Sequence, residues 1–174
     1  MSGPDPVVRP RIERQTGETP ISPHPYDLVL TRIFDGPPEK VWRAWTDPEV
    51  MPKWFVPRPW TLSKCELDVR PGGSSLVVMR DPEGNEFPNP GVYLDVVPGK
   101  RLVFTDAYGP GWTPSEKPFF TAVIELEDLG DGRTRYTATA RHWTAESKET
   151  HEKMGFHQGW GQCADQLAEI LPTL

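Results

Sequence analysis

Residues 34–48 read FDGPPEKVWRAWTDP, and residues 68–73 further along read DVRPGG. In the first stretch a β-rich segment ends at a Pro-Pro pair, which sets the backbone conformation that opens a helix. Val41, Trp42 and Trp45 then follow at positions i, i+1 and i+4, on one face of that helix. The sequence therefore predicts a strand that leads directly into a short helix with an aromatic face.

The composition limits the class of protein. A chain of 174 residues suits one domain with its own core. The 19 basic and 25 acidic residues give a net charge of −6, and the basic ones form no run, so no nucleic-acid partner is expected. No stretch reaches the roughly 18 apolar residues of a membrane span, and no basic-then-apolar segment opens the chain. We therefore expect a cytoplasmic protein.

The residues that usually carry metal, redox or acyl-transfer chemistry are not grouped in this chain. Cys65 and Cys163 are too few for a disulfide framework, and no His, Cys or carboxylate cluster has the spacing of metal ligands. Neither a Gly-x-Ser-x-Gly elbow nor a dinucleotide-binding glycine pattern occurs. The sequence predicts no metal and no cofactor.

The N-terminal part divides into a leader and the start of a domain. Residues 1–25 are rich in proline and charge, which predicts a flexible leader, and residues 26–174 form the predicted domain. Residues 26–34 predict the first strand and residues 38–46 a helix. The Asp-Pro pair at 47–48 resembles a helix N-cap and first position, so it predicts a second short helix.

From Trp60 onward the apolar pattern changes to a period of two, which is typical of strands. Turn-forming pairs of Gly, Pro, Asp and Asn separate these segments and predict antiparallel hairpins. The predicted strands are residues 62–69, 75–80, 91–97, 101–106, 119–127 and 134–142. In the last two, apolar and small residues alternate with charged and polar ones, so one face of the sheet is expected to be solvated.

A long helix is predicted for the C-terminal segment. Thr144 is a suitable N-cap, and apolar residues recur at steps of three and four as far as Leu171. Gly155, Gly159 and Gly161 each cost about 1 kcal/mol relative to alanine inside a helix. We expect such glycines only at a bend, at a close approach or beside open space.

This order of elements resembles the helix-grip fold of the START and Bet v 1-like (SRPBCC) superfamily, an α+β fold. The closest resemblance is to the family of proteins like the activator of Hsp90 ATPase homologue 1. Four blocks in order carry it: VWRAWTDP at 41–48 with Trp54, DVRPGG at 68–73, LVFT at 102–105 and MGFHQGW at 154–160.

The resemblance implies a curved antiparallel sheet around a long C-terminal helix, with two short helices after the first strand and an apolar cavity beneath the long helix. It does not imply one activity, because relatives include carriers, metabolite binders, cyclase-type enzymes and co-chaperones. The leader is shorter than the extra N-terminal domain of the full-length co-chaperones. A chaperone partner is therefore not expected, whereas a homodimer is an open alternative.

Large aromatic residues and small ones indicate where a ligand would bind. Taken singly, each ring is typical of core packing. Where small residues face large ones, however, a pocket of several hundred Å³ can persist. The predicted ligand-binding residues are Trp54, Trp60, Val77, Met79, Phe104, Trp112, Phe120, Tyr136, Ala138, His142, Phe156 and Trp160. The Gly- and Pro-rich segment 106–118 is either a lid over this pocket or an ordinary connection.

Histidines are the weak catalytic candidates. His142 continues the inward-facing row of its strand, and His157 lies in the glycine-rich block, so either could act as a base; a structural role is the alternative for both. His151 is expected to face solvent. Asp68 and Arg70 lie on one face of a strand before a Gly-Gly turn, a spacing that favours a salt bridge.

The predicted function is the binding of a small apolar or aromatic molecule between the last helix and the concave sheet, with no catalytic step required. Two alternatives stay open. One is an enzyme of cyclase, dehydratase or hydrolase type, with His142, His157 or Tyr136 as acid or base. The other is a protein-interaction module that uses its outer surface.

Overall fold

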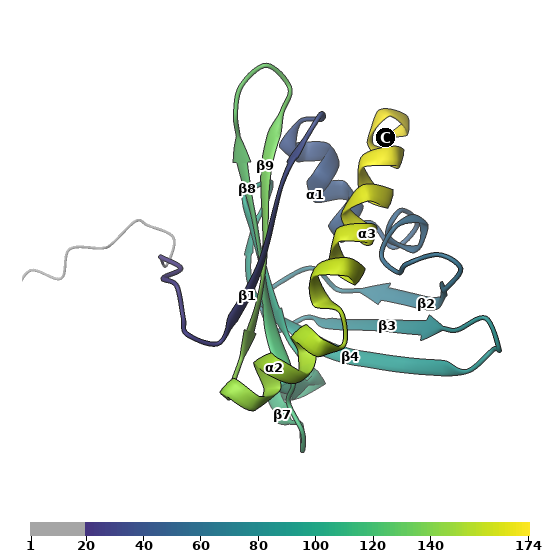
Figure 1. Cartoon of the computed structure of the whole chain (residues 1–174), viewed down its shortest axis with the longest axis vertical. Coiled ribbons are helices and arrows are strands. Elements are labelled where there is room, and N and C mark those ends of the chain that lie inside the picture. Colours follow the sequence, from purple (N-terminus) through teal and green to yellow (C-terminus); the bar gives the residue numbers. More distant parts are fainter. Residues whose placement is uncertain (1–19) are drawn as a thin grey trace, which may run out of the picture.

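The computed structural model describes residues 20–174, so most of the leader predicted at residues 1–25 lies outside the described part of the chain. One large antiparallel sheet curves around the helices on its concave side (Figure 1). Its strands are β1 (Asp27–Phe34), β2 (Thr61–Leu67), β3 (Ser74–Arg80), β4 (Glu86–Val97), β5 (Arg101–Thr105), β8 (Phe120–Asp128) and β9 (Thr134–His142). The fold is α+β, as the sequence predicted.

The sheet has the strand order β1-β9-β8-β5-β4-β3-β2. Every neighbouring pair is antiparallel, and most are joined by the short turns that the sequence marks. β2, β3 and β4 turn away from the other four strands (Figure 1). The two-residue strands β6 (Tyr108–Gly109) and β7 (Thr113–Pro114) form a separate small hairpin in the chain segment that connects β5 to β8. The curvature leaves a concave side that the helices cover only in part.

The short helices after β1 follow the sequence prediction with one correction. α1 spans Pro38–Thr46, as expected. The second helix is only the 3₁₀ turn η1 (Met51–Lys53). The Asp47 carboxylate accepts a hydrogen bond from the Glu49 backbone N–H at 2.9 Å, so it closes a local turn and does not cap a longer helix.

The predicted C-terminal helix is broken into two. α2 (Ala145–Lys153) begins at Thr144, whose hydroxyl accepts from the Ser147 backbone N–H at 3.0 Å, so the predicted N-cap is confirmed. α3 spans Phe156–Ile170, and the 3₁₀ turn η3 (Leu171–Thr173) follows. Gly155 separates the two helices with φ 94° and ψ 40°. A left-handed residue cannot continue an α-helix, and glycine adopts that conformation at little cost.

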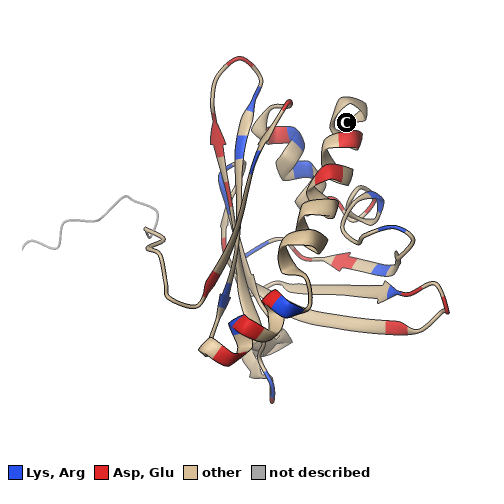
Figure 2. Ribbon diagram, viewed as in Figure 1, with Lys and Arg blue, Asp and Glu red and all other residues tan. Residues whose placement is uncertain are grey.

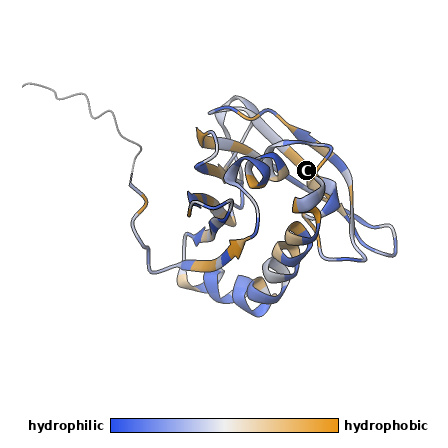
Figure 3. Cartoon of the chain, turned by 90° about the horizontal axis from the view of Figure 1, so that it is seen from above, coloured by the Kyte–Doolittle hydropathy of each residue, from blue (hydrophilic) through white to orange (hydrophobic). Residues whose placement is uncertain are grey.

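The core lies between the sheet and α1, η1 and α3. Ala122, Ile124 and Leu126 of β8 are buried against it, together with Leu167 and Leu171 at the C-terminal end of the chain. Apolar segments in Figure 3 lie along the strands and α3. The apolar stripe predicted for the C-terminal segment therefore packs as expected.

The outer face of the sheet is not wholly solvated, in contrast to the prediction. Val103, Val123 and Thr139 stand in register across three strands and are buried there, while Val29 at the edge is exposed. On the outer face of the curved sheet, side chains that are neighbours across strands shield one another from solvent, so the edge of this face is more exposed than its centre. Along the described part of the chain, charged residues of both signs are interspersed on the ribbon (Figure 2).

Candidate functional site

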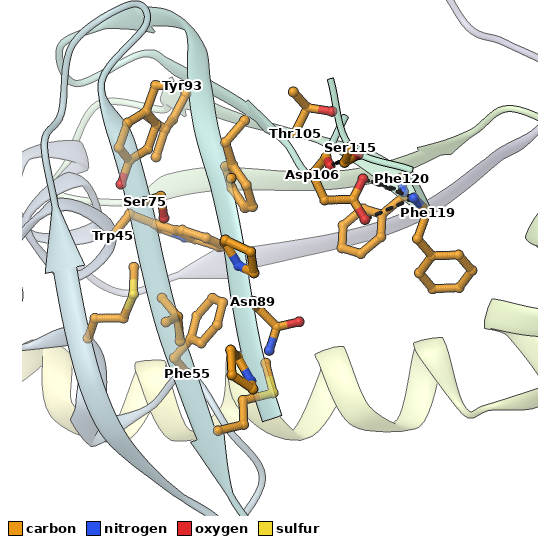
Figure 4. Close-up of a pocket in the computed structure, with 18 of the residues that line it drawn as sticks. Trp45, Phe55, Ser75, Asn89, Tyr93, Thr105, Asp106, Ser115, Phe119 and Phe120 are labelled. Carbon is orange, nitrogen blue, oxygen red and sulfur yellow. Dashed lines mark hydrogen bonds between the residues drawn. The ribbon is translucent and has the colours of Figure 1, made fainter. Parts of the chain in front are cut away.

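A cavity of about 380 Å³ opens on the concave side of β3, β4 and β5. Its floor comes from these strands and its roof from α1, η1 and Phe55; its remaining wall comes from the segment after β5 and the first residue of β8 (Figure 4). The apolar wall residues are Trp45, Met51, Phe55, Val77, Met79, Pro88, Pro90, Gly91, Leu102, Phe104, Phe119 and Phe120. The polar ones are Ser75, Asn89, Tyr93, Thr105, Asp106, Ser115 and Lys117. Rings dominate the lining.

Strand register decides which side chains reach this cavity. Val77 of β3 stands opposite Asn89 of β4, and Tyr93 of β4 stands opposite Phe104 of β5. Residues directly opposite one another in an antiparallel pair share a face, so these four point to the concave side. At Gly91 a Cβ would lie 2.5 Å from the Thr105 carbonyl oxygen. Glycine there permits the close approach of β4 and β5 that shapes the floor.

Tyr93 and Ser75 place two hydroxyls together in the wall (Figure 4). Burial raises the pKa of Tyr93 to about 12, although a hydrogen bond with the Ser75 side chain opposes this rise. The Tyr93 hydroxyl is therefore neutral at physiological pH. It can donate a hydrogen bond but cannot serve as a ready base.

Asp106 organises the wall between β5 and β8. Its carboxylate accepts backbone N–H bonds from Phe119 at 2.9 and 2.8 Å and from Phe120 at 3.3 Å (Figure 4). Burial raises the pKa of Asp106, while these backbone bonds oppose the rise. The Ser115 hydroxyl donates to the Asp106 carbonyl at 2.6 Å. The carboxylate thus fixes the two phenyl rings in the wall, and its oxygens are already occupied.

Trp45 crosses from the core into the roof of the cavity. Its ring contacts the rings of Trp54, Phe55 and Phe104 at centroid distances of 4.9, 5.7 and 5.7 Å. The indole Nε1 is enclosed by protein and has no acceptor in good hydrogen-bonding geometry among residues 20–174. Burial raises the pKa of Tyr136, and the neighbouring Trp45 side chain opposes that rise. This N–H therefore faces the core near Tyr136.

The structure brings four of the predicted ligand-binding residues together on the cavity wall, namely Val77, Met79, Phe104 and Phe120. The sequence interpretation did not name Trp45, Phe55, Tyr93 or Phe119 for this site. The signal for Trp45 and Tyr93 was present, since both lie among the apolar or alternating positions that predicted buried faces. Which buried ring also borders open space depends on the curvature of the sheet.

The other eight predicted residues lie elsewhere. Trp54, Tyr136, Ala138, His142 and Phe156 are buried in packed surroundings, Trp160 is half-buried beside them, and Trp60 and Trp112 are exposed. The Trp54 indole N–H donates to the Ala44 carbonyl at 2.9 Å. Trp60 packs on Phe87, and Trp112 lies against Gly72 at the β6–β7 hairpin.

The cavity also lies away from its expected place beneath the last helix, because no residue of α3 is on its wall. α3 packs directly on β1 and on residues 54–58. The side-chain amide of the buried Gln166 donates to the carbonyls of Trp54 and Val56 and accepts from the Arg58 N–H. These contacts close the space under α3 and leave the hollow on the side of α1 and η1.

His142 and His151 form a buried pair, which corrects the expectation that His151 faces solvent. His142 Nδ1 lies 2.9 Å from the Tyr26 carbonyl oxygen, and His142 Nε2 lies 2.8 Å from His151 Nδ1. A carbonyl can only accept, so His142 donates from Nδ1 to Tyr26, while the donor of the His142–His151 bond depends on the tautomers of the two rings. Burial, and secondarily the charge of His142, lowers the pKa of His151 to about 4.

The histidine pair is enclosed by rings. Those of Phe119, Phe120 and Phe156 lie 5.0 to 5.2 Å from the His151 ring. Phe119 and Phe120 separate the pair from the cavity, so neither imidazole is on its wall. His157 is exposed on α3. The geometry places the predicted catalytic candidates outside the cavity.

Three further expectations from the sequence concern a salt bridge, metal ligands and membrane-spanning helices. Arg70 and Asp68 form the predicted salt bridge at 2.9 Å. Within residues 20–174, no group of three or more His, Cys, Asp or Glu side chains has the arrangement of a metal site. No helix in the same range is long and apolar enough to cross a membrane.

A curved antiparallel sheet around a C-terminal helix, with a ring-lined cavity on its concave side, defines an α+β protein of the helix-grip class. The family model described as activator of Hsp90 ATPase homolog 1-like protein matches residues 35–172. The chain belongs to this family, and the predicted resemblance is confirmed.

Solved structures agree with this assignment. The crystal structure of protein NE0264 from Nitrosomonas europaea has 49% sequence identity and a TM-score of 0.81, over 84% of this chain and 94% of that one. Protein CV1439 from Chromobacterium violaceum has 26% identity and a TM-score of 0.68, over 83% and 96%. The AHSA1 (SPO3351) protein from Silicibacter pomeroyi, at 23% identity and a TM-score of 0.64 over 84% and 98%, is similar in fold. No curated protein matches this chain at a significant level.

Proposed function

We propose that this protein binds a small apolar or aromatic molecule in the cavity between Trp45 and the concave side of β3–β5. The observation that carries the proposal is an unfilled hollow of about 380 Å³ with rings on several sides. Ligand pockets typically occupy about 300–1,000 Å³ and are lined mainly by apolar and aromatic groups. A well-packed core leaves few voids larger than a water molecule, so a hollow of this size in the wall of the core supports binding.

The chemistry of the lining supports an apolar ligand. Trp45, Phe55 and Phe104 present rings from helix, loop and strand, and Val77 and Met79 add aliphatic and thioether surface. Apolar surface removed from water contributes about 25 cal/mol per Å², and rings add favourable edge-to-face contacts. A flat aromatic molecule between these groups would be stabilised both by burial of its apolar surface and by ring contacts.

A filled cavity is the direct test. Val77→Phe adds a ring inside the hollow, whereas Val29→Phe adds the same ring on the exposed outer face of β1 and serves as the matched control. The probe is N-phenyl-1-naphthylamine, a neutral molecule whose fluorescence rises in apolar surroundings. We expect the wild type and the control to bind it alike and Val77→Phe to bind at least 10-fold more weakly, with all three unfolding cooperatively.

Equal probe binding by Val77→Phe and the wild type would contradict the proposal. Native mass spectrometry of freshly purified protein gives a second test, since a carrier is expected to retain small molecules that the Val77→Phe variant lacks. The enzyme alternative predicts turnover of a bound molecule, and the interaction module predicts no ligand effect on melting temperature.

A further inference from the structure

The cavity wall carries an unused hydrogen-bond donor. Tyr93 and Ser75 both line the cavity, and their hydroxyls are neighbours at the end beside Trp45 (Figure 4). The pair has two hydroxyl protons, and a bond between the two groups can use at most one of them. Within residues 20–174, no carbonyl or carboxylate accepts from either hydroxyl. At least one O–H is therefore left without a protein acceptor among these residues.

Most of the other polar groups on the wall are already committed. The hydroxyls of Thr105 and Thr121 lie 2.9 Å apart, and Ser115 donates to a backbone carbonyl. The Asp106 oxygens accept three backbone bonds. The Asn89 side-chain amide donates one N–H to the Phe87 carbonyl at 3.0 Å, so its carbonyl oxygen and its second N–H remain available for hydrogen bonds. The Tyr93 end thus offers an O–H that lacks an acceptor, beside hydroxyl lone pairs that can also accept.

The charges around the cavity exclude an anion at this end. Burial disfavours any charge beside Tyr93, and the nearby Asp68 carboxylate is paired with Arg70, so within the described residues no free cation offsets that cost there. Asp106 contributes a second carboxylate to the wall. Lys117, the cation among the wall residues, is exposed on the segment between β5 and β8. A neutral acceptor satisfies the free O–H without burying a charge.

We infer that the ligand carries a neutral oxygen acceptor, such as the carbonyl of a ketone, aldehyde, ester or amide, which binds the Tyr93–Ser75 hydroxyl pair while its apolar body lies between Trp45 and Phe104. This inference rests on the proposed function. It adds a polar specificity element to an otherwise apolar site, since a site that holds an unpaired donor discriminates against analogues without an acceptor.

Three probes with one ring system test the inference: 2-acetylnaphthalene, 2-ethylnaphthalene and 2-naphthoate. They match in skeleton and differ in the group at one position, which is a ketone, a hydrocarbon or a carboxylate. We expect the ketone to bind about 5–10-fold more tightly than the hydrocarbon, the size expected for one hydrogen bond. The carboxylate should bind most weakly. Affinities are measured by displacement of N-phenyl-1-naphthylamine.

The variants separate the hydroxyls from the shape of the site. Tyr93→Phe combined with Ser75→Ala removes both O–H groups and keeps the ring, and it should bind the ketone and the hydrocarbon equally. Tyr136→Phe, which removes a buried hydroxyl that is not on the wall, is the matched control and should keep the wild-type preference.

Each outcome has a defined meaning. If the wild type binds the ketone no better than the hydrocarbon, or if the double variant keeps the preference, the inference fails while ligand binding stands. A preference for the carboxylate overturns the inference in favour of recognition by Lys117. If none of the three probes binds, the proposed function fails with it.

Discussion

Substituting Gly155 by alanine tests the break between α2 and α3. Gly155 has φ 94° and ψ 40°, a left-handed conformation that side chains with a Cβ rarely adopt. The space around it is open, because a Cβ there would meet only the Gln158 side-chain oxygen, at 3.7 Å. Any loss of stability in Gly155→Ala must therefore come from the backbone and not from a clash.

The expected size of the effect follows from this geometry. A residue with a Cβ costs roughly 1–2 kcal/mol in the left-handed region. In a domain of about 150 residues, each kcal/mol shifts the melting temperature by roughly 2–4 °C, so we expect a fall of about 2–8 °C. A continuous helix, as the sequence predicted, would give the opposite sign, because alanine is about 1 kcal/mol better than glycine inside a helix.

Gly159→Ala is the matched control, four residues further along. Gly159 lies within α3, and no atom comes within 4 Å of the position of its Cβ. This variant should gain about 0.5–1 kcal/mol. Urea denaturation followed by circular dichroism measures both, with equal slopes as the check that the unfolded states are comparable. A Gly155→Ala variant as stable as the wild type, or more stable, would refute the description of two separate helices.

Two more predictions concern buried polar groups. Gln166→Leu should lower the free energy of unfolding by about 3 kcal/mol, because it leaves three backbone groups of residues 54–58 unpaired, whereas the exposed Gln158→Leu should change it by less than about 0.5 kcal/mol. The lowered pKa of His151, about 4 against the ordinary 6.5, means that the unfolded chain binds more protons between these values. The stabilisation from neutral His151 is thus complete above about pH 6.5 and is lost as the pH falls through about 4. Urea denaturation at pH 7, 5.5 and 4.5 should show a smaller pH dependence in His151→Gln than in the wild type, and equal dependence would contradict a buried, neutral His151.

Local patterns predicted most of the elements. The Pro-Pro pair at 37–38 and the spacing of Val41 and Trp45 located α1, and alternation with turn residues located the strands of the large sheet. β4 is longer than predicted, since it runs from Glu86 through two prolines. Proline has no backbone N–H to donate to a neighbouring strand, so its presence argues against a strand in the sequence. Only the pairing with β3 shows that β4 continues through these prolines.

The position of the cavity proposed to bind a ligand was harder to predict from the sequence. The predicted pocket included Val77, Met79, Phe104 and Phe120, and these do line the cavity. It also included Tyr136, which alternation placed on the inner face but which packs against core neighbours. Periodicity gives the face of a strand, but it does not say whether that face meets another side chain or open space.

The sequence by itself determined the helix-grip order, the inward apolar faces of the strands, the Thr144 N-cap and the turns between most strands, because these depend on residues close together in the chain. Tertiary structure alone decided three things: the break at Gly155, the burial of His151 against His142, and the position of the hollow beside Trp45 instead of beneath α3. Each depends on how the sheet curves and on which distant segment covers it. Such contacts are set by the packing of the whole domain.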